Sequence, residues 1–184
     1  MPVKILFVSH ATTLDNETDK SSGWFDVCLS PLGYQQAHEM GERNSDRHID
    51  AIFCSDLQRS YLSAEIGFAG RITRMDGAPG IPIFRDARLR EIDYGDLTRA
   101  DTSLTKQKTE HIEISFPNGE SYTDSNARMK DFLDELCANY DGKTVLVVGH
   151  RATQYALEHF ILGIPMTDVV AAKFKWQPWW EYSL

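Results

Sequence analysis

Val3-Lys4-Ile5-Leu6-Phe7-Val8-Ser9-His10 and Val145-Leu146-Val147-Val148-Gly149-His150 are the two stretches of sequence that decide the fold. Each starts with a short run rich in branched apolar residues, interrupted only by Lys4 in the first stretch. Such runs are typical of strands buried on both faces of a parallel sheet. We therefore expect His10 and His150 to lie just beyond the ends of two buried strands.

The rest of the chain alternates between strand and helix patterns. Residues 49–54 predict a third strand, and residues 81–84, which include Pro82, predict a short edge strand. Helical patterns occupy four segments: 34–43 behind a cap at Ser30 and Pro31, a helix opening at 55–59, and residues 121–140 and 153–162. This alternation predicts an α/β fold with a mostly parallel central sheet flanked by helices. Residues 85–116 are polar and weakly periodic, which predicts an insertion or lid over the sheet.

Length and composition favour one domain over residues 1–184. The formal net charge of -8 and the pI of about 5.2 argue against nucleic-acid binding, so any phosphate site has to be a local pocket. The three cysteines are scattered, which favours neither a disulfide framework nor a metal site. The first apolar run is too short for a signal peptide or a membrane span, so we expect a cytoplasmic protein without a membrane partner.

Side chains that can bind phosphate follow three of the predicted strands. His10 and His150 each follow one, and Arg59 follows the strand that ends at Cys54. In an open α/β sheet, ligands bind beyond the carboxyl ends of the strands, where helix N-termini present free N–H groups. Because a guanidinium can bind two phosphate oxygens at once, we expect Arg59 to complete a phosphate site with the two imidazoles.

An acidic segment, Leu89-Arg90-Glu91-Ile92-Asp93-Tyr94-Gly95, adds a candidate proton donor. A carboxyl group beside bound phosphate can stay protonated near neutral pH, because the like charge disfavours its ionised form. We assign the role of general acid to Glu91, with Asp93 and Glu120 as alternatives.

Five segments resemble motifs of the histidine phosphatase superfamily, in the family's order and over nearly the whole chain. Phe7-Val8-Ser9-His10-Ala11-Thr12-Thr13 resembles its Arg-His-Gly-Glu-Thr signature, and Asn16 lies where the family often has an asparagine. The other four resemble its Ser-x-Leu-x-Arg-Ala segment, its acid-bearing motif, its Pro-x-Gly-Glu-Ser turn and its second-histidine strand, and they are residues 55–60, 89–95, 117–121 and 147–150.

The resemblance implies a phosphoglycerate mutase-like fold and a two-step reaction that needs no metal and no organic cofactor. His10 attacks the phosphorus of a small phosphorylated metabolite while Glu91 protonates the departing oxygen, and a phosphohistidine forms. Water then hydrolyses the phosphohistidine, with Glu91 accepting a proton. Arg59 and His150 hold the non-bridging oxygens during both steps.

The first motif departs from the family pattern at its arginine, which is Ser9 here, and at the two following positions, Ala11 and Thr12. Serine offers one neutral hydrogen bond where arginine offers a charge-assisted pair, a loss of roughly 2–4 kcal/mol of transition-state stabilisation. That loss corresponds to a rate lower by on the order of 30- to 1000-fold. Arg151, where the family usually has glycine, is a candidate to restore the charge. The expected phosphate-binding residues are therefore Arg59, Ser9, Asn16 and Arg151.

The sequence leaves several functions open. Mutases and phosphatases share this site, but by resemblance the phosphoglycerate mutases carry a longer insertion than the roughly 60 residues between Glu91 and His150 here. This favours hydrolysis of a small phosphomonoester. The alternatives are a phosphoglycerate mutase-type phosphotransferase and a weakened or inactive relative that binds phosphate without turnover. A metal hydrolase that uses His10, Glu91 and His150 ranks lower, because the tight spacing of a motif such as His-Glu-x-x-His is missing.

The segment Phe174-Lys175-Trp176-Gln177-Pro178-Trp179-Trp180 is unusually rich in aromatic residues. This density fits packing in the core, a contact in a homodimer, or a rim around the substrate site. The sequence does not decide among the three.

Overall fold

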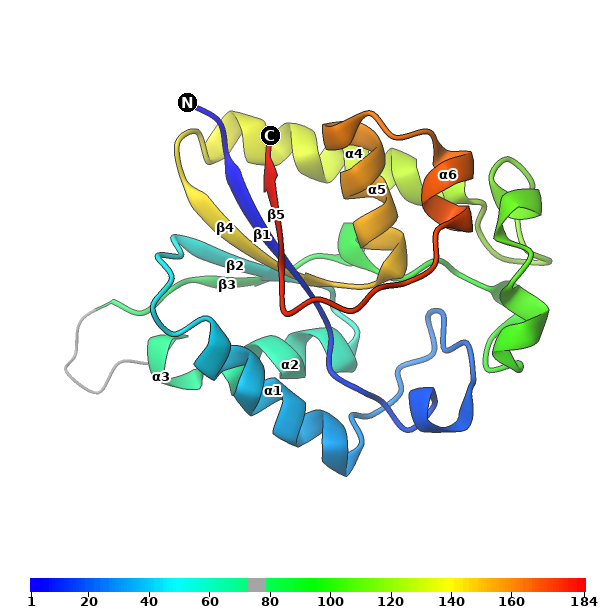
Figure 1. Ribbon diagram of the computed structural model, residues 1–184, viewed down its shortest axis with the longest axis horizontal. Coiled ribbons are helices and arrows are strands. Elements are labelled where there is room, and N and C mark those ends of the chain that lie inside the picture. The colour runs from blue at the N-terminus through cyan, green and yellow to red at the C-terminus, as the bar shows by residue number, and fades with distance from the viewer. Residues whose placement is uncertain (73–78) are drawn as a thin grey trace.

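The computed structural model describes residues 1–72 and 79–184 and has a five-stranded sheet at its centre (Figure 1). The strands are β1 (Lys4–Ser9), β2 (Ala51–Cys54), β3 (Ile83–Arg85), β4 (Thr144–Gly149) and β5 (Trp180–Ser183). Their order is β3-β2-β4-β1-β5, and every neighbouring pair is parallel except β1 with β5. The predicted α/β fold with a mostly parallel sheet is confirmed, and β3 is the short edge strand expected beside Pro82.

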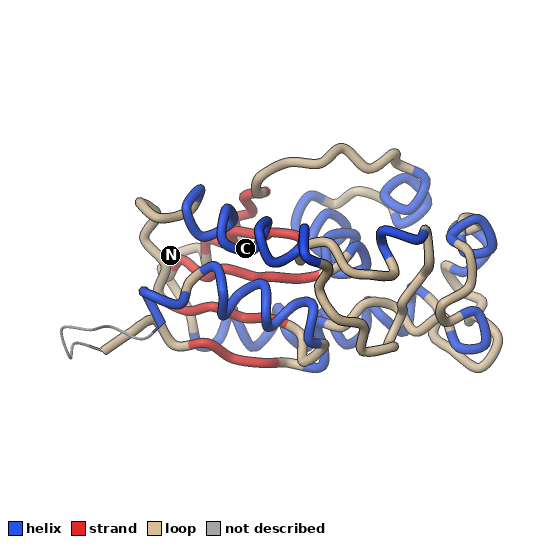
Figure 2. The backbone as a smooth tube through the Cα atoms, turned by 90° about the horizontal axis from the view of Figure 1, so that it is seen from below, coloured by secondary structure: helices blue, strands red, loops and turns tan. Residues whose placement is uncertain are grey.

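Helices cover both faces of the sheet. They are α1 (Pro31–Arg43), α2 (Gln58–Gly67), α3 (Ala69–Ile72), α4 (Tyr122–Asn139), α5 (Arg151–Leu162) and α6 (Met166–Ala171). Helices α1 to α3 lie on one side of the sheet and α4 to α6 on the other (Figure 1), and Figure 2 views the sheet from the α1 side. Helix α1 begins as predicted, because the Ser30 hydroxyl accepts a hydrogen bond from the Gly33 N–H at 3.1 Å and Pro31 is its first residue.

Alternate residues of β1 belong to the two halves of the core. Ile5 and Phe7 pack in the cluster that contains the apolar residues of α4 and α5. Leu6 and Val8 pack in the cluster that contains those of α1 and α2. Burial on both faces explains why this run has no polar alternation. It also fixes the carboxyl end of β1, where the candidate functional residues begin.

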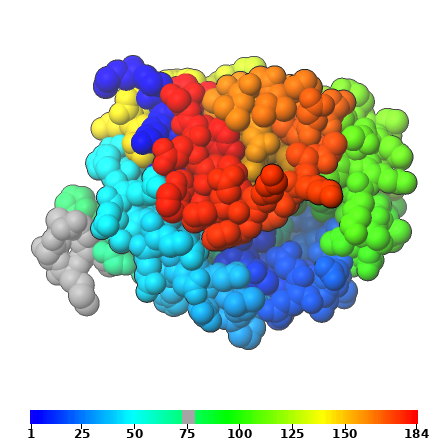
Figure 3. All heavy atoms as spheres, viewed as in Figure 1, coloured from blue at the N-terminus to red at the C-terminus, as the bar shows by residue number. Residues whose placement is uncertain are grey.

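The C-terminal segment adds elements that the sequence patterns did not predict. Strand β5 pairs with the outer edge of β1, and the backbones of Val3 and Leu184 exchange two hydrogen bonds of 2.9 Å. Between α6 and β5, residues 172–179 run without regular structure. In Figure 3 the red C-terminal segment crosses the front of the molecule between the orange α5 region and the α1 region. It thus spans the two helical layers.

Residues 85–116 are irregular, as expected, and contain short 3-10 turns at Ala87–Leu89, Gly95–Leu97, Thr102–Thr105 and Lys108–His111. They lie beyond the carboxyl ends of the strands (Figure 1, green) rather than over a face of the sheet, so the insertion faces the site at one end of the sheet. Within the part of the chain that the structure describes, no helix is both long and apolar enough to cross a membrane.

Candidate active site

His10 and His150 lie side by side because their strands are neighbours in the sheet. Ser9 is paired with Gly149 at the end of the parallel ladder, and the His10 N–H donates to the Gly149 carbonyl at 3.0 Å. The centroids of the two imidazole rings are 4.9 Å apart. The register of the two apolar runs therefore brings together the two histidines that follow them.

The imidazole of His10 is oriented by its own backbone. Its Nδ1 atom lies 2.8 Å from the carbonyl oxygen of Ala11. Because a carbonyl only accepts hydrogen bonds, Nδ1 carries the proton and Nε2 holds a free lone pair. Burial, with the positive charge of Arg59 as a second cause, lowers the pKa of His10 from 6.5 to about 3. His10 is therefore neutral near pH 7, as a nucleophile has to be.

His150 is buried and held by a serine. Its Nε2 atom lies 2.7 Å from the hydroxyl oxygen of Ser55, the first residue after β2. Its Nδ1 atom has no hydrogen-bond partner among the described residues. Burial first, then the charges of Arg59 and His10, lower the pKa of His150 well below its ordinary value. A buried polar atom without a partner calls for an explanation, and an incoming ligand oxygen is one.

Arg59 is buried, with only 2% of the residue exposed, and it does not belong to the pocket lining. Its guanidinium donates to the carbonyl oxygens of Gly23 at 2.7 Å and Phe25 at 3.1 Å. Gly23 has φ 52°, a left-handed conformation that favours glycine. Burial lowers the pKa of Arg59. A guanidinium has five N–H groups, so the two that hold this loop leave others for a ligand.

Glu91 receives hydrogen bonds from the N-terminus of α5. Its Oε1 atom accepts from the N–H groups of Ile92 at 2.9 Å and Ala152 at 3.1 Å, and its Oε2 atom accepts from the Arg151 N–H at 3.1 Å. A carboxyl group is favoured at a helix N-terminus because the N–H groups there lack partners within the helix. Because α5 begins directly after His150, this contact carries Glu91 to the histidines.

The two alternative acids lie elsewhere. The Asp93 carboxylate accepts from the Gly95 N–H at 2.9 Å, within its own turn. Glu120 forms an ion pair with Arg128 at 3.0 Å. Only Glu91 of the three lines the pocket beside His10. The geometry therefore favours Glu91 as the acid.

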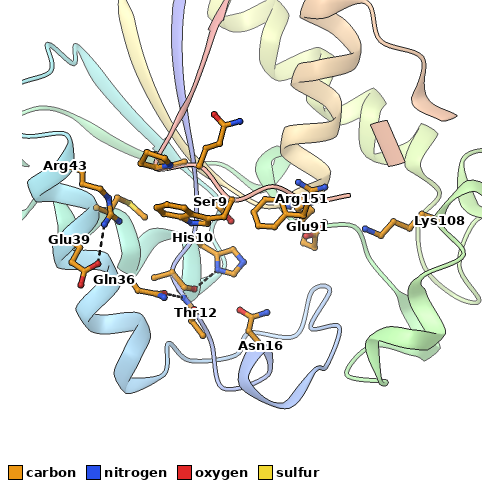
Figure 4. A pocket seen from close by; sticks show the side chains of 17 residues that line it. Ser9, His10, Thr12, Asn16, Gln36, Glu39, Arg43, Glu91, Lys108 and Arg151 are labelled. Atoms are coloured by element: carbon orange, nitrogen blue, oxygen red, sulfur yellow. Dashed lines mark hydrogen bonds and ion pairs between the residues drawn. The ribbon is translucent and has the colours of Figure 1, made fainter. Parts of the chain in front are cut away.

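A pocket of about 570 Å³ opens in front of His10 (Figure 4). Its lining includes most of the residues that the sequence singled out, namely Ser9, His10, Asn16, Glu91 and Arg151. The Asn16 side-chain oxygen accepts from the Thr13 N–H at 3.0 Å, which leaves its amide N–H groups free to donate. His150 and Arg59 are absent from the lining and lie behind it.

Sequence patterns missed two residues of the site. Lys108 lines the pocket, but it belongs to the irregular segment 85–116, where no periodicity indicates which side chains face inward. Ser55 has no predicted role of its own, although its place directly after β2 puts it at the same sheet edge as His10 and His150.

The aromatic C-terminal segment divides between the pocket rim and the core. Phe174 and Trp176 line the pocket, and Trp176 is 63% exposed. The Arg43 guanidinium of α1 lies 5.6 Å from the centroid of the Trp176 ring. Trp180 packs on Phe7 with a centroid distance of 5.6 Å. Two of the three roles left open by the sequence, rim and core, thus apply to different residues of the segment.

The ligand set for a metal hydrolase can be compared with the structure. Across residues 1–72 and 79–184, no three His, Cys, Asp or Glu side chains come together in a way that could hold a metal ion.

Comparison with known proteins places this fold and site in a family. The family model for the histidine phosphatase superfamily (branch 1) matches residues 5–175. Phosphoserine phosphatase 1 of Hydrogenobacter thermophilus is 27% identical over 174 residues, which cover 90% of this chain and 79% of that protein. A probable phosphoglycerate mutase GpmB of Erwinia tasmaniensis is 30% identical over 172 residues, which cover 89% and 76% of the two chains.

Solved structures agree. YhfR of Bacillus stearothermophilus matches with a TM-score of 0.80 and 25% identity, covering 96% of this chain and 88% of that one. A mycobacterial glucosyl-3-phosphoglycerate phosphatase in complex with VO3 matches with a TM-score of 0.76 and 25% identity, covering 92% and 87%. The chain belongs to the histidine phosphatase superfamily and has its phosphoglycerate mutase-like fold. The family and the names of these relatives support an enzyme of the phosphatase or mutase type.

Proposed function

We propose that this protein hydrolyses a small phosphomonoester through a phosphohistidine on His10. The observation that carries the proposal is the lone pair on Nε2 of His10, which faces a pocket shared with Glu91 while Nδ1 is held by the Ala11 carbonyl. An oriented, neutral imidazole beside a carboxyl group is the pair that a two-step phosphoryl transfer requires.

In the first step, Nε2 of His10 attacks the phosphorus and the bond to the ester oxygen breaks. The proton for that oxygen comes from the Glu91 carboxyl group, whose Oε2 accepts one backbone N–H and has a lone pair left to carry a proton. The products are a phosphohistidine, a Glu91 carboxylate and an alcohol. The unpartnered Nδ1 of His150 and the free N–H groups of Arg59 are suited to donate to the non-bridging oxygens.

In the second step, a water oxygen attacks the phosphorus and the bond to His10 breaks. One water proton goes to the Glu91 carboxylate, which restores the acid, and phosphate leaves the pocket. Glu91 gives one proton to the leaving alcohol and recovers one from the attacking water, so we propose a reaction that needs no metal.

Two alternative activities each have an observation in their favour. Ser9 lines the pocket where the family signature has arginine, which favours a relative that binds phosphate and turns over slowly or not at all. A phosphotransferase of the mutase type is favoured by the relative from Erwinia tasmaniensis, which is named as a probable mutase. Transfer to a second alcohol instead of water would distinguish a mutase.

The test measures turnover and the intermediate together. Purified protein is given an aryl phosphate with and without EDTA, and acid-labile phosphate is trapped on the wild type, on His10→Ala and on His38→Ala, a control at an exposed histidine of α1. We expect EDTA-resistant turnover and labelling in the wild type and the control, and neither in His10→Ala. Turnover that survives His10→Ala overturns the nucleophile assignment. A wild type that binds phosphate without turnover or label supports the inactive relative.

A further inference from the structure

Two cations of the pocket converge on one phenol. The Lys108 ammonium donates to the Tyr155 hydroxyl at 2.8 Å, and the Arg151 guanidinium donates to the same oxygen at 3.2 Å. Both cations line the pocket, and Tyr155 is buried in α5 beneath them. Lys108 comes from residues 85–116 and Arg151 from the first turn of α5, so the contact joins two separate parts of the fold.

Neither cation is neutralised by a carboxylate of residues 1–72 or 79–184. Among the described residues, no carboxylate lies within ion-pair distance of the Lys108 ammonium or the Arg151 guanidinium, whose other partner is the neutral Gln154 amide at 2.7 Å. The third cation of the pocket differs, because Arg43 is paired with Glu39 at 3.2 Å. In a chain with a net charge of -8, two adjacent unpaired cations facing a pocket are a place for an anion.

The pair is also held in place before any ligand arrives. The Arg151 guanidinium lies 4.7 Å from the centroid of the Tyr155 ring and 4.4 Å from that of Phe174, within cation–π distance of both rings. The Lys108 ammonium lies 5.2 Å from the Tyr155 ring. Side chains fixed in this way lose little conformational entropy when a ligand binds.

The position of the pair relates it to the leaving group. In the proposed reaction Glu91 gives its proton to the departing oxygen, so the leaving group lies on the Glu91 side of the phosphorus. The Arg151 N–H binds Glu91 directly, and Lys108 approaches Arg151 from the side away from His10 (Figure 4). The two cations therefore face whatever the ester oxygen carries.

We propose that Lys108 and Arg151 form a second anion subsite, which selects phosphomonoesters whose leaving group carries a carboxylate or a second phosphate. This inference rests on the proposed function, because the proposed reaction is what places the leaving group beside Glu91. Arg151, which is next to the acid, contacts both ends of such a substrate, whereas Lys108 contacts only the added anion.

The test compares three esters of one carbon skeleton: glycerol 3-phosphate without a second anion, 3-phosphoglycerate with a carboxylate, and glycerol bisphosphate with a second phosphate. We expect the wild type to prefer one or both of the charged esters in kcat/KM by about tenfold, the effect of one charge-assisted contact. Lys108→Gln reduces that preference to about twofold or less. Lys106→Gln, at an exposed lysine of the same segment, keeps it.

The same three compounds are titrated calorimetrically into His10→Ala and His10→Ala/Lys108→Gln, where no turnover interferes. A Kd preference that depends on Lys108 supports the subsite even if the wild type hydrolyses nothing, in which case the proposed function alone fails. Equal kcat/KM and Kd values for the three compounds overturn the subsite, as does a Lys108→Gln effect that is equal on all of them. The better of the two charged esters identifies the anion as carboxylate or phosphate.

Discussion

The Ser55 hydroxyl oxygen lies 2.7 Å from Nε2 of His150, and the same oxygen accepts a hydrogen bond from the Leu57 N–H at 3.4 Å. A hydroxyl oriented by that N–H has its own proton available to donate to Nε2. The ring proton of neutral His150 is then on Nδ1, the atom without a partner. Ser55 therefore makes a neutral imidazole into a donor for a phosphate oxygen.

Ser55→Ala is expected to weaken inhibition by inorganic phosphate about tenfold, because the ring loses the tautomer that donates. Nitrogen-15 chemical shifts of His150 report the tautomer directly and should move from Nδ1–H toward Nε2–H. Ser55→Thr keeps the hydroxyl and should restore both values. An unchanged tautomer in Ser55→Ala would contradict this role.

Glu91→Gln removes the proton donor and keeps one side-chain oxygen for the Ile92 and Ala152 N–H groups, while its NH2 group replaces the oxygen that accepts from the Arg151 N–H. We expect kcat/KM for an alkyl phosphate to fall by roughly 100- to 10,000-fold, the usual contribution of a general acid. An aryl phosphate should lose much less, because its leaving group departs without a proton. Equal losses on both substrates would mean that Glu91 acts through the structure of α5, which a thermal melt of the variant would reveal.

Ser9→Arg restores the arginine of the family signature at a position that lines the pocket. The added charge should raise kcat/KM by about tenfold. The upper limit is the full effect of such a contact, which is on the order of 30- to 1000-fold. Ser9→Ala serves as the control and should lower kcat/KM only slightly. No gain in a folded Ser9→Arg protein would show that another group already supplies the charge.

Arg151 is the candidate to supply the positive charge that Ser9 lacks. Arg151→Ala should weaken phosphate binding about tenfold, measured by calorimetry, because an unpaired cation is lost from the pocket. Arg43→Ala removes a cation that Glu39 already pairs, and it should change phosphate affinity far less. Phosphate affinity that survives Arg151→Ala would exclude compensation for Ser9.

Acid should destabilise the protein through His10 and His150, whose pKa values are both lowered by folding. Because the pKa of His10 is about 3 in the folded chain and 6.5 in the unfolded one, the unfolded chain binds the extra proton between these values. The contribution of His10 to stability is therefore constant above about pH 6.5 and falls as the pH drops toward 3. Between pH 6.5 and 4.5, His10 should account for about 1–3 kcal/mol of lost unfolding free energy.

Urea titrations at about pH 6.5 and about pH 4.5 measure this loss of unfolding free energy. His10→Asn should show a smaller pH dependence than the wild type, and His38→Asn, at an exposed position, should match the wild type. Identical pH dependence in all three proteins would rule out His10 as a source of acid sensitivity.

The sequence was sufficient wherever a short-range pattern determines the structure. Apolar runs predicted β1 and β4, and because parallel neighbours end at one edge, they also predicted that His10 and His150 meet there. Capping residues predicted the start of α1. These features depend on a few adjacent residues, so they can be recognised without the rest of the fold.

Features that depend on long-range contacts were missed. Strand β5 has only four residues, too few for a clear periodic signal, and it forms because the edge of β1 is free to accept it. The partners of Arg59 are the backbone carbonyls of Gly23 and Phe25, and no residue type signals them. Lys108 lines the pocket because of the way the irregular segment 85–116 folds, and no periodic pattern predicts that. The homodimer and the cytoplasmic location stay predictions.

The antiparallel pairing of β5 has a consequence for assembly. Unpaired sheet edges invite strand addition from another molecule, which leads to edge-to-edge aggregation. Since β5 occupies the free edge of β1, the strand that leads to His10 is an interior strand. Removing residues 180–184 would turn it into an edge strand, so a truncated chain should self-associate at concentrations where the intact chain does not.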